Sequence, residues 1–275
     1  MAARVAATVW RRTLPRVNVR KTYKLFIGGA FPRSESGRTF DVNGHNAALA
    51  SRKDARDAVK AARSAFGKWS GATAYNRGQI LYRAAEMLEG RRSEFPAEEV
   101  DEAVDRLVWY AGWADKLAQV MGSANPVAAP YFNISSPEPT GVVAVVAPRS
   151  FLGLVSVVAP VIVTGNTCVV VTGAAVEAIT FAEVLATSDL PGGVVNILTG
   201  HAGEVAPWLA SHDDVNGLDL TGVEDAGLAV ELERQAGETL KRVLRPSDPK
   251  WTDDPGTGRM TVFLEIKTVW HPKGV

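Results

Sequence analysis

Apolar runs alternate with glycine-containing turns between Pro148 and Gly227, and this alternation limits the chain to few folds. The stretch ends in two such phrases, Leu190-Pro-Gly-Gly-Val-Val-Asn-Ile-Leu-Thr-Gly200 and Leu220-Thr-Gly-Val-Glu-Asp-Ala-Gly227. Each phrase stands where an apolar run ends and a turn must form. That layout is typical of strands and helices that alternate in a parallel sheet.

Read element by element, this part of the chain repeats a strand followed by a helix. The predicted strands are Gly141–Val146, Asn166–Val171, Val194–Leu198, Gly217–Leu220 and Leu240–Leu244. The predicted helices are Phe151–Val163, Val176–Ser188, His201–Ser211 and Asp225–Gln235. The fold class is therefore predicted to be α/β, a Rossmann-like doubly wound parallel sheet.

The residues before this sheet predict helices that flank it. Lys53–Phe66 is amphipathic, and Ser51 with Asp54 forms its predicted capping box. Two more helices are expected over Asn76–Phe95 and Ala97–Met121, while Tyr23–Phe31 is expected to be a strand entering a hairpin. The third helix starts with a cluster of acidic residues. We interpret the cluster as the negative charge that a helix N-terminus favours, in preference to a metal site. Its members are Glu98, Glu99, Asp101, Glu102 and Asp105.

Two segments predict a projecting β-arm, residues 128–139 and the alternating run Met260–Trp270. Proline and glycine mark residues 247–259 as a linker. We therefore divide the chain into a disordered basic tail (1–21), a main domain (22–246) and a C-terminal strand (260–275). The arm would leave unpaired backbone groups at its edges, which predicts association by strand addition.

Composition excludes several functional classes. The formal net charge is 0, so no overall field favours nucleic acid or an anionic membrane. No apolar run is long enough to span a bilayer. A single cysteine rules out an internal disulfide framework and indicates a cytoplasmic protein. The basic tail resembles a transit peptide, but we prefer to interpret it as a disordered tail or as the result of an early start codon.

Four patches of sequence resemble the NAD(P)-dependent aldehyde dehydrogenases. They are Phe26–Phe31, the pair Ala65–Trp69 with Arg77–Leu81, the run from Pro137 to Pro148 with Gly165–Thr167, and the stretch described first. The resemblance covers roughly residues 22 to 245 and implies NAD or NADP as cofactor, aldehydes oxidised to acids, and a C-terminal strand that joins a neighbouring subunit.

Several positions depart from what the resemblance implies. Ser150 stands where the family places an asparagine that helps to hold the oxyanion, so an amide donor is replaced by a hydroxyl. Val171 and Ala174 stand where a lysine and a glutamate contact the adenosine ribose. Neither replacement offers a hydrogen bond there, so cofactor binding is predicted to be weak or absent.

The glycine-spaced turn is kept only in part. Gly222 and Gly227 match the family turn whose amides approach the pyrophosphate. A family serine is Val223 here, and Glu224 and Asp225 add negative charge that opposes an anionic ligand. We therefore regard Gly222 and Gly227 as vestigial cofactor-binding residues, and Val171, Ala174 and Val223 as lost contacts.

No residue of this chain is assigned a catalytic role. The family segment with its nucleophilic cysteine and general base is missing after Leu244. Cys168 lies in an apolar run without a neighbouring cation, so we interpret it as structural rather than nucleophilic. The four histidines show no metal-ligand spacing, and no metal site is predicted.

Three hypotheses follow for function. The chain is a degenerate family member that lacks catalysis alone and acts by associating with itself or with a full-length relative. Alternatively, it is an oxidoreductase that needs a partner to supply nucleophile and base, or a truncated gene product without a function. We prefer the first and third over autonomous catalysis.

Overall fold

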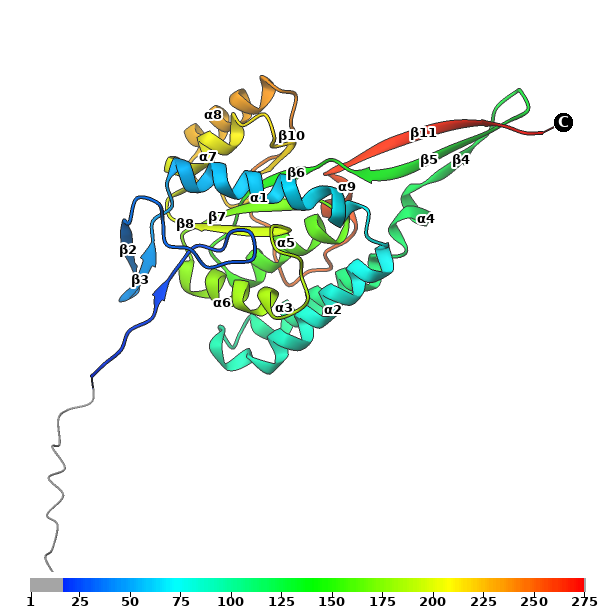
Figure 1. Ribbon diagram of the computed structural model, residues 1–275. Helices are drawn as coiled ribbons and strands as arrows, with labels where there is room; N and C mark the ends of the chain where they lie inside the picture. The colour runs from blue at the N-terminus through cyan, green and yellow to red at the C-terminus, as the bar shows by residue number, and fades with distance from the viewer. Residues whose placement is uncertain (1–16, 275) are drawn as a thin grey trace, which may run out of the picture.

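Five parallel strands form the centre of the protein, in the order β10-β9-β6-β7-β8 (Figure 1). The structure is a computed structural model that describes residues 17–274. The strands are β6 (Val142–Val146), β7 (Thr167–Thr172), β8 (Val195–Thr199), β9 (Gly217–Asp219) and β10 (Arg242–Leu244). The connecting helices are α5 (Phe151–Val163), α6 (Ala175–Ala186), α7 (Ala202–Ala210) and α8 (Ala226–Gly237). The predicted α/β fold with a Rossmann-like sheet is confirmed.

The sheet is buried on both faces, because alternate side chains of each strand enter two separate cores. On one face Val143, Cys168 and Val170 pack among α2, α3, α5 and α6. On the other face Val142, Val169 and Leu198 pack among α1, α7 and α8. Figure 1 shows the same arrangement, with α1 and α7 on one side of the sheet and α5 and α6 on the other.

The N-terminal helices are α1 (Arg52–Ser70), α2 (Ala74–Gly90), the short 3₁₀ helix η1 (Arg92–Glu94), α3 (Val100–Trp113) and α4 (Leu117–Met121). The Ser51–Asp54 capping box of α1 is confirmed. The single helix predicted over residues 97–121 is wrong. Two hydrogen bonds, from Ala114 N to the Ala111 oxygen and from Lys116 N to the Trp113 oxygen, tighten the chain between α3 and α4.

The strand predicted over Tyr23–Phe31 is largely irregular, but the turn predicted at its end is present, because Ile27 and Ala30 exchange two backbone hydrogen bonds of 3.0 Å. Only β1 (Thr22–Tyr23) is regular, and the chain then turns at Gly28 and Gly29, whose φ angles are 62° and 83°. A longer hairpin, which was not predicted, is formed by β2 (Thr39–Val42) and β3 (His45–Ala48). Its turn is Asn43-Gly44, both left-handed, with φ angles of 52° and 80°.

A second, antiparallel sheet forms the arm, from β4 (Ser123–Asn125), β5 (Tyr131–Pro139) and β11 (Leu264–Pro272). β11 pairs with β5 along its whole length, from Leu264 opposite Pro139 to Pro272 opposite Tyr131. Figure 1 shows this sheet projecting away from the body of the protein, with the C-terminal end of the chain near its tip. The predicted arm is confirmed, although residues 258–261 form the short helix α9 and not the start of the strand.

The predicted linker, residues 247–259, has few regular elements, but Trp251 packs against the core beside α5. Of the predicted basic tail, residues 1–16 lie outside the described residues. The domain boundaries given above remain predictions. Between residues 17 and 274, no helix is both long and apolar enough to cross a membrane.

Candidate functional site

A cleft of about 660 Å³ lies at the carboxyl edge of the parallel sheet. The strand order reverses between β6 and β9, and ligands of open α/β sheets bind at the carboxyl ends of strands beside such a reversal. The loops after β6, β7, β8 and β9 all contribute to the lining, with part of the β2–β3 hairpin. The charged residues that line it are Asp41, Arg149, Glu177, Glu224 and Asp225.

Gly222 is required by close packing of two loops. A Cβ at this position would lie 2.3 Å from the carbonyl carbon and oxygen of Ala147, in the loop that follows β6. The Gly222 amide donates to the Val146 oxygen at 2.9 Å, and the Val223 amide donates to the Leu220 oxygen at the same distance. The Gly222 amide ties this loop to the end of β6 and the Val223 amide closes a local turn, so neither is directed at a ligand.

Gly227 lies in the exposed first turn of α8, where a Cβ would meet only the Asp225 Oδ1 atom at 3.1 Å. Asp225 is the N-cap of this helix, and its carboxylate accepts from the Leu228 amide at 3.0 Å. A carboxylate therefore already occupies part of the helix N-terminus, where an anion would otherwise bind. The sequence analysis predicted Gly227 in this turn, but it did not predict that Asp225 caps α8.

Val171 and Ala174, the positions of the predicted lost contacts, both line the cleft. The structure adds two polar residues beside them that the sequence reading missed, Thr172 and Glu177. The Thr172 hydroxyl accepts from the Ala174 amide at 3.1 Å. Glu177 lies in the first turn of α6, and its spacing of one helical turn from Ala174 was the signal that could have identified it.

An ion pair joins the two loops that flank the strand reversal. Arg149, which follows β6, donates from Nε and Nη2 to the two carboxylate oxygens of Glu224, which follows β9, at 2.8 and 3.2 Å. Both side chains are largely exposed and both line the cleft. The sequence predicted the negative charge of Glu224 but not its partner.

Ser150 is the N-cap of α5, and its hydroxyl accepts from the Gly153 amide at 3.1 Å. Nearby, the Glu99 carboxylate accepts from the Leu152 amide at 2.7 Å. Both contacts provide acceptors for backbone amides in the first turn of α5, which have no partner within the helix. Glu99, a member of the acidic cluster that precedes α3, thus stabilises the start of α5. Within the described part of the chain, no three His, Cys, Asp or Glu side chains form a group that could hold a metal ion.

Cys168 lies in the middle of the sheet, on β7, and is fully buried. Burial raises the pKa of its thiol to about 12, because the thiolate would lose its solvation, and a hydrogen bond involving Asn196 offsets little of that effect. The thiol therefore stays protonated at neutral pH. This supports the interpretation of Cys168 as a structural residue.

A buried ionic network that the sequence reading missed lies at the end of β9. Asp219 is almost completely buried, and it accepts from Arg259 Nη1 at 3.0 Å and from the Thr221 amide at 2.9 Å. Arg259 also donates to the Thr221 hydroxyl at 2.9 Å. Burial raises the pKa of Asp219, and the neighbouring Arg259 charge opposes that rise. Arg259 is the last residue of the predicted linker, so this network ties that segment to the end of β9.

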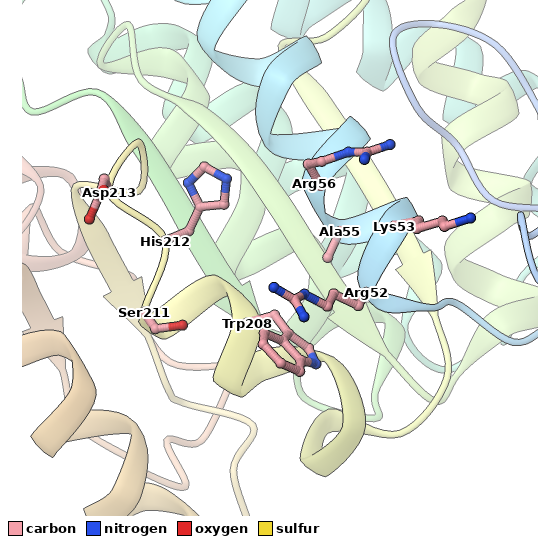
Figure 2. Close-up of a pocket in the computed structure, with 8 residues that line it drawn as sticks. All are labelled: Arg52, Lys53, Ala55, Arg56, Trp208, Ser211, His212 and Asp213. Atoms are coloured by element: carbon pink, nitrogen blue, oxygen red, sulfur yellow. The ribbon is translucent and has the colours of Figure 1, made fainter.

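A second pocket, of about 630 Å³, lies between α1 and α7 (Figure 2). The guanidinium of Arg52, on α1, lies 3.9 Å from the centre of the Trp208 ring, on α7, and His212 after the end of α7 lines the same pocket. The other two cations of this pocket have acidic partners, Lys53 with Glu35 at 3.4 Å and Arg56 with Asp57 at 2.9 Å. The pocket is therefore a surface groove without an unpaired charge cluster.

Residues 42–245 match the sequence profile of the aldehyde dehydrogenase family. That match covers most of the chain and includes the whole parallel sheet. The chain belongs to the aldehyde dehydrogenase family. The resemblance found in the sequence is thus confirmed.

Individual members of the family show how much of it this chain contains. The chain is 31% identical over 251 residues to aldehyde dehydrogenase, cytosolic 1 of Elephantulus edwardii, covering 80% of this chain and 49% of that protein. The crystal structure of HpcC from Thermus thermophilus superposes with a TM-score of 0.74 and 28% identity, covering 81% and 47%.

An aldehyde dehydrogenase from Bacillus cereus, solved as its NAD+ complex, superposes with a TM-score of 0.73 and 26% identity, covering 81% and 50%. The chain spans about half the length of the curated aldehyde dehydrogenases that it matches.

Proposed function

We propose that this aldehyde dehydrogenase family protein does not oxidise aldehydes by itself and acts by associating, through its β-arm, with a second copy or with a full-length relative. The observation that carries the proposal is the exposure of the arm. Every residue of β11 after Leu264 is exposed, and β11 is the outer strand of its sheet. A long edge strand of this kind presents unpaired N–H and C=O groups that another strand can complete.

The side chains of the arm support the same proposal. Large apolar residues are exposed on both β5 and β11, where water solvates them in the isolated chain. They are Tyr131, Phe132 and Ile134 on β5, and Ile266, Val269 and Trp270 on β11. Aromatic and aliphatic side chains gathered on one projecting element are typical of an interaction surface.

The lack of autonomous catalysis is supported by the surroundings of three residues. Cys168 is buried and protonated, so it cannot attack an aldehyde. The Ser150 hydroxyl already serves as the acceptor that caps α5. Gly222 donates its amide to Val146, so it is not free for a pyrophosphate.

The residues of the cleft do not fit the dinucleotide that the family's fold implies. Four carboxylates line the cleft, at Asp41, Glu177, Glu224 and Asp225. Against them, Arg149 is the one lysine or arginine among the described lining residues, and it is already paired with Glu224. An acidic wall repels the two phosphates of NAD or NADP, so we propose that binding of either is weak or absent. The single, buried cysteine is compatible with the cytoplasm, which we propose as the location.

The test compares the purified chain alone and mixed with a full-length aldehyde dehydrogenase from the same cell. Size-exclusion chromatography with light scattering should show a species larger than the monomer, or co-elution with the relative. Aldehyde oxidation with NAD or NADP should be undetectable for the chain alone. A soluble monomer that fails to bind the relative would contradict the association, and turnover that Cys168→Ala abolishes would contradict the lack of catalysis.

A further inference from the structure

The Arg149–Glu224 ion pair bridges the two loops between which a ligand of this fold enters. Arg149 follows β6 and Glu224 follows β9, the two strands where the sheet order reverses. The two nitrogen–oxygen distances, 2.8 and 3.2 Å, form the fork geometry in which an arginine would grip a phosphate. Glu224 therefore occupies the donors that a phosphate would need.

No other lysine or arginine lies in the described lining of the cleft to replace Arg149. Two backbone donors of the glycine turn are also engaged, because the Gly222 amide donates to Val146 and the Leu228 amide donates to the Asp225 carboxylate. The attraction of this cleft for an anion thus depends on whether Arg149 is free.

We infer that Glu224 is a selectivity residue that keeps nucleotide phosphates out of the cleft by holding Arg149, and that Arg149 is the residue that binds them when Glu224 is removed. The inference rests on the proposal that the cleft is a remnant nucleotide site. The pair is solvent-exposed on both sides, with 84% and 69% of the two side chains accessible. Such pairs are weak, so a single substitution is enough to release the arginine.

The experiment measures binding of ADP and of adenosine by isothermal titration to the full chain and to Glu224→Gln. ADP should bind the variant about three- to tenfold more tightly, because one charge is removed beside the phosphate and one arginine is released. Adenosine has no phosphate, so its affinity should be unchanged. The substituted residue is exposed, and unchanged thermal unfolding would show that the fold is intact.

Two further variants separate the release of Arg149 from a simple change in charge. Glu177→Gln removes an equal charge from the same cleft but breaks no ion pair that the structure contains, so its gain for ADP should be clearly smaller. Arg149→Gln combined with Glu224→Gln should lose most of the gain. Equal ADP affinities for wild type and Glu224→Gln, including no binding to either, would overturn the inference, as would an equal gain in Glu177→Gln.

This outcome is independent of the test of the proposed function. Association and turnover are read from chromatography and from aldehyde oxidation, whereas the inference is read from a ratio of ADP affinities. A monomeric or catalytically active chain would leave that ratio interpretable.

Discussion

The cleft and the arm differ in what holds them in place. Every residue of β6, β7, β8 and β9 is buried, and the loops of the cleft are fixed by backbone hydrogen bonds and the Asp219–Arg259 network. The arm is fixed mainly by the ladder between β5 and β11, with nearly all of β11 in solvent. The loops of the cleft thus rest on a buried sheet, whereas the arm is an exposed sheet with little core of its own. The comparison indicates that burial on both faces, and not the polar side chains of the cleft, holds the parallel sheet together.

Labelling of cysteines should show the largest difference between the two regions. Burial raises the pKa of Cys168 from its ordinary value of 9.0 to about 12, which lowers the thiolate fraction about a thousandfold at neutral pH. Native protein should therefore resist iodoacetamide, and unfolded protein should take up one equivalent by mass spectrometry. A cysteine introduced at Lys267, which is exposed on the arm, should react at once. Rapid native labelling of Cys168 would contradict its structural role.

Loss of the buried ion pair should have the next largest effect. Arg259→Gln leaves the Asp219 carboxylate buried without its cation, which should lower the free energy of unfolding by about 3–5 kcal/mol near pH 7. A buried carboxylate has a raised pKa, and the folded state then binds more protons than the unfolded state as pH falls. The loss should therefore shrink toward pH 4. Urea unfolding at both pH values measures it.

The matched control is the exposed pair at the base of the arm. Arg242 donates to Glu265 at 2.7 Å from both Nε and Nη2, but both side chains are solvent-accessible. Arg242→Gln should cost less than about 1 kcal/mol. Equal losses for the two variants would remove the distinction between the cleft and the arm.

The two glycines of the turn should respond differently to the same substitution. Gly222→Ala places a Cβ 2.3 Å from the Ala147 backbone, which should lower stability by about 1–3 kcal/mol or prevent folding. Gly227→Ala meets only an Asp225 oxygen at 3.1 Å, in a helix that favours alanine, and should change stability by less than about 1 kcal/mol. Thermal unfolding of the two variants measures the contrast, and a similar loss for both would show that the turn is not fixed by Gly222.

Changes on the arm should affect stability least and association most. Ile266 and Trp270 are both exposed, and replacing them with serine and threonine should change the free energy of unfolding by less than about 0.5 kcal/mol. The same variant should shift the light-scattering mass toward the monomer. A large loss of stability without a change in mass would mean that these side chains pack within the chain and do not serve a partner.

The sequence determined the fold class and most strands of the sheet, because a strand buried on both faces must be a continuous apolar run. It also determined the capping box of α1 and the pairing of two distant segments in the arm. It failed where local preference and packing disagree. Helix α3, for example, buries Arg106, because Arg106 donates to the backbone oxygens of Trp251 and Asp253, which lie far away in the sequence. The Asn43-Gly44 hairpin turn was readable from the sequence and was missed.

Only the tertiary structure decided the state of the cleft. The sequence placed Glu224, Asp225 and Gly222 in one turn, but it could not show that Arg149 pairs with Glu224, that Asp225 caps α8 or that Gly222 packs on Ala147. Nor could it join Arg259 to Asp219, 40 residues away in the chain. The physical reason is that apolar patterning depends on neighbours in sequence. Charge pairing and close backbone packing depend on which loops the sheet brings together.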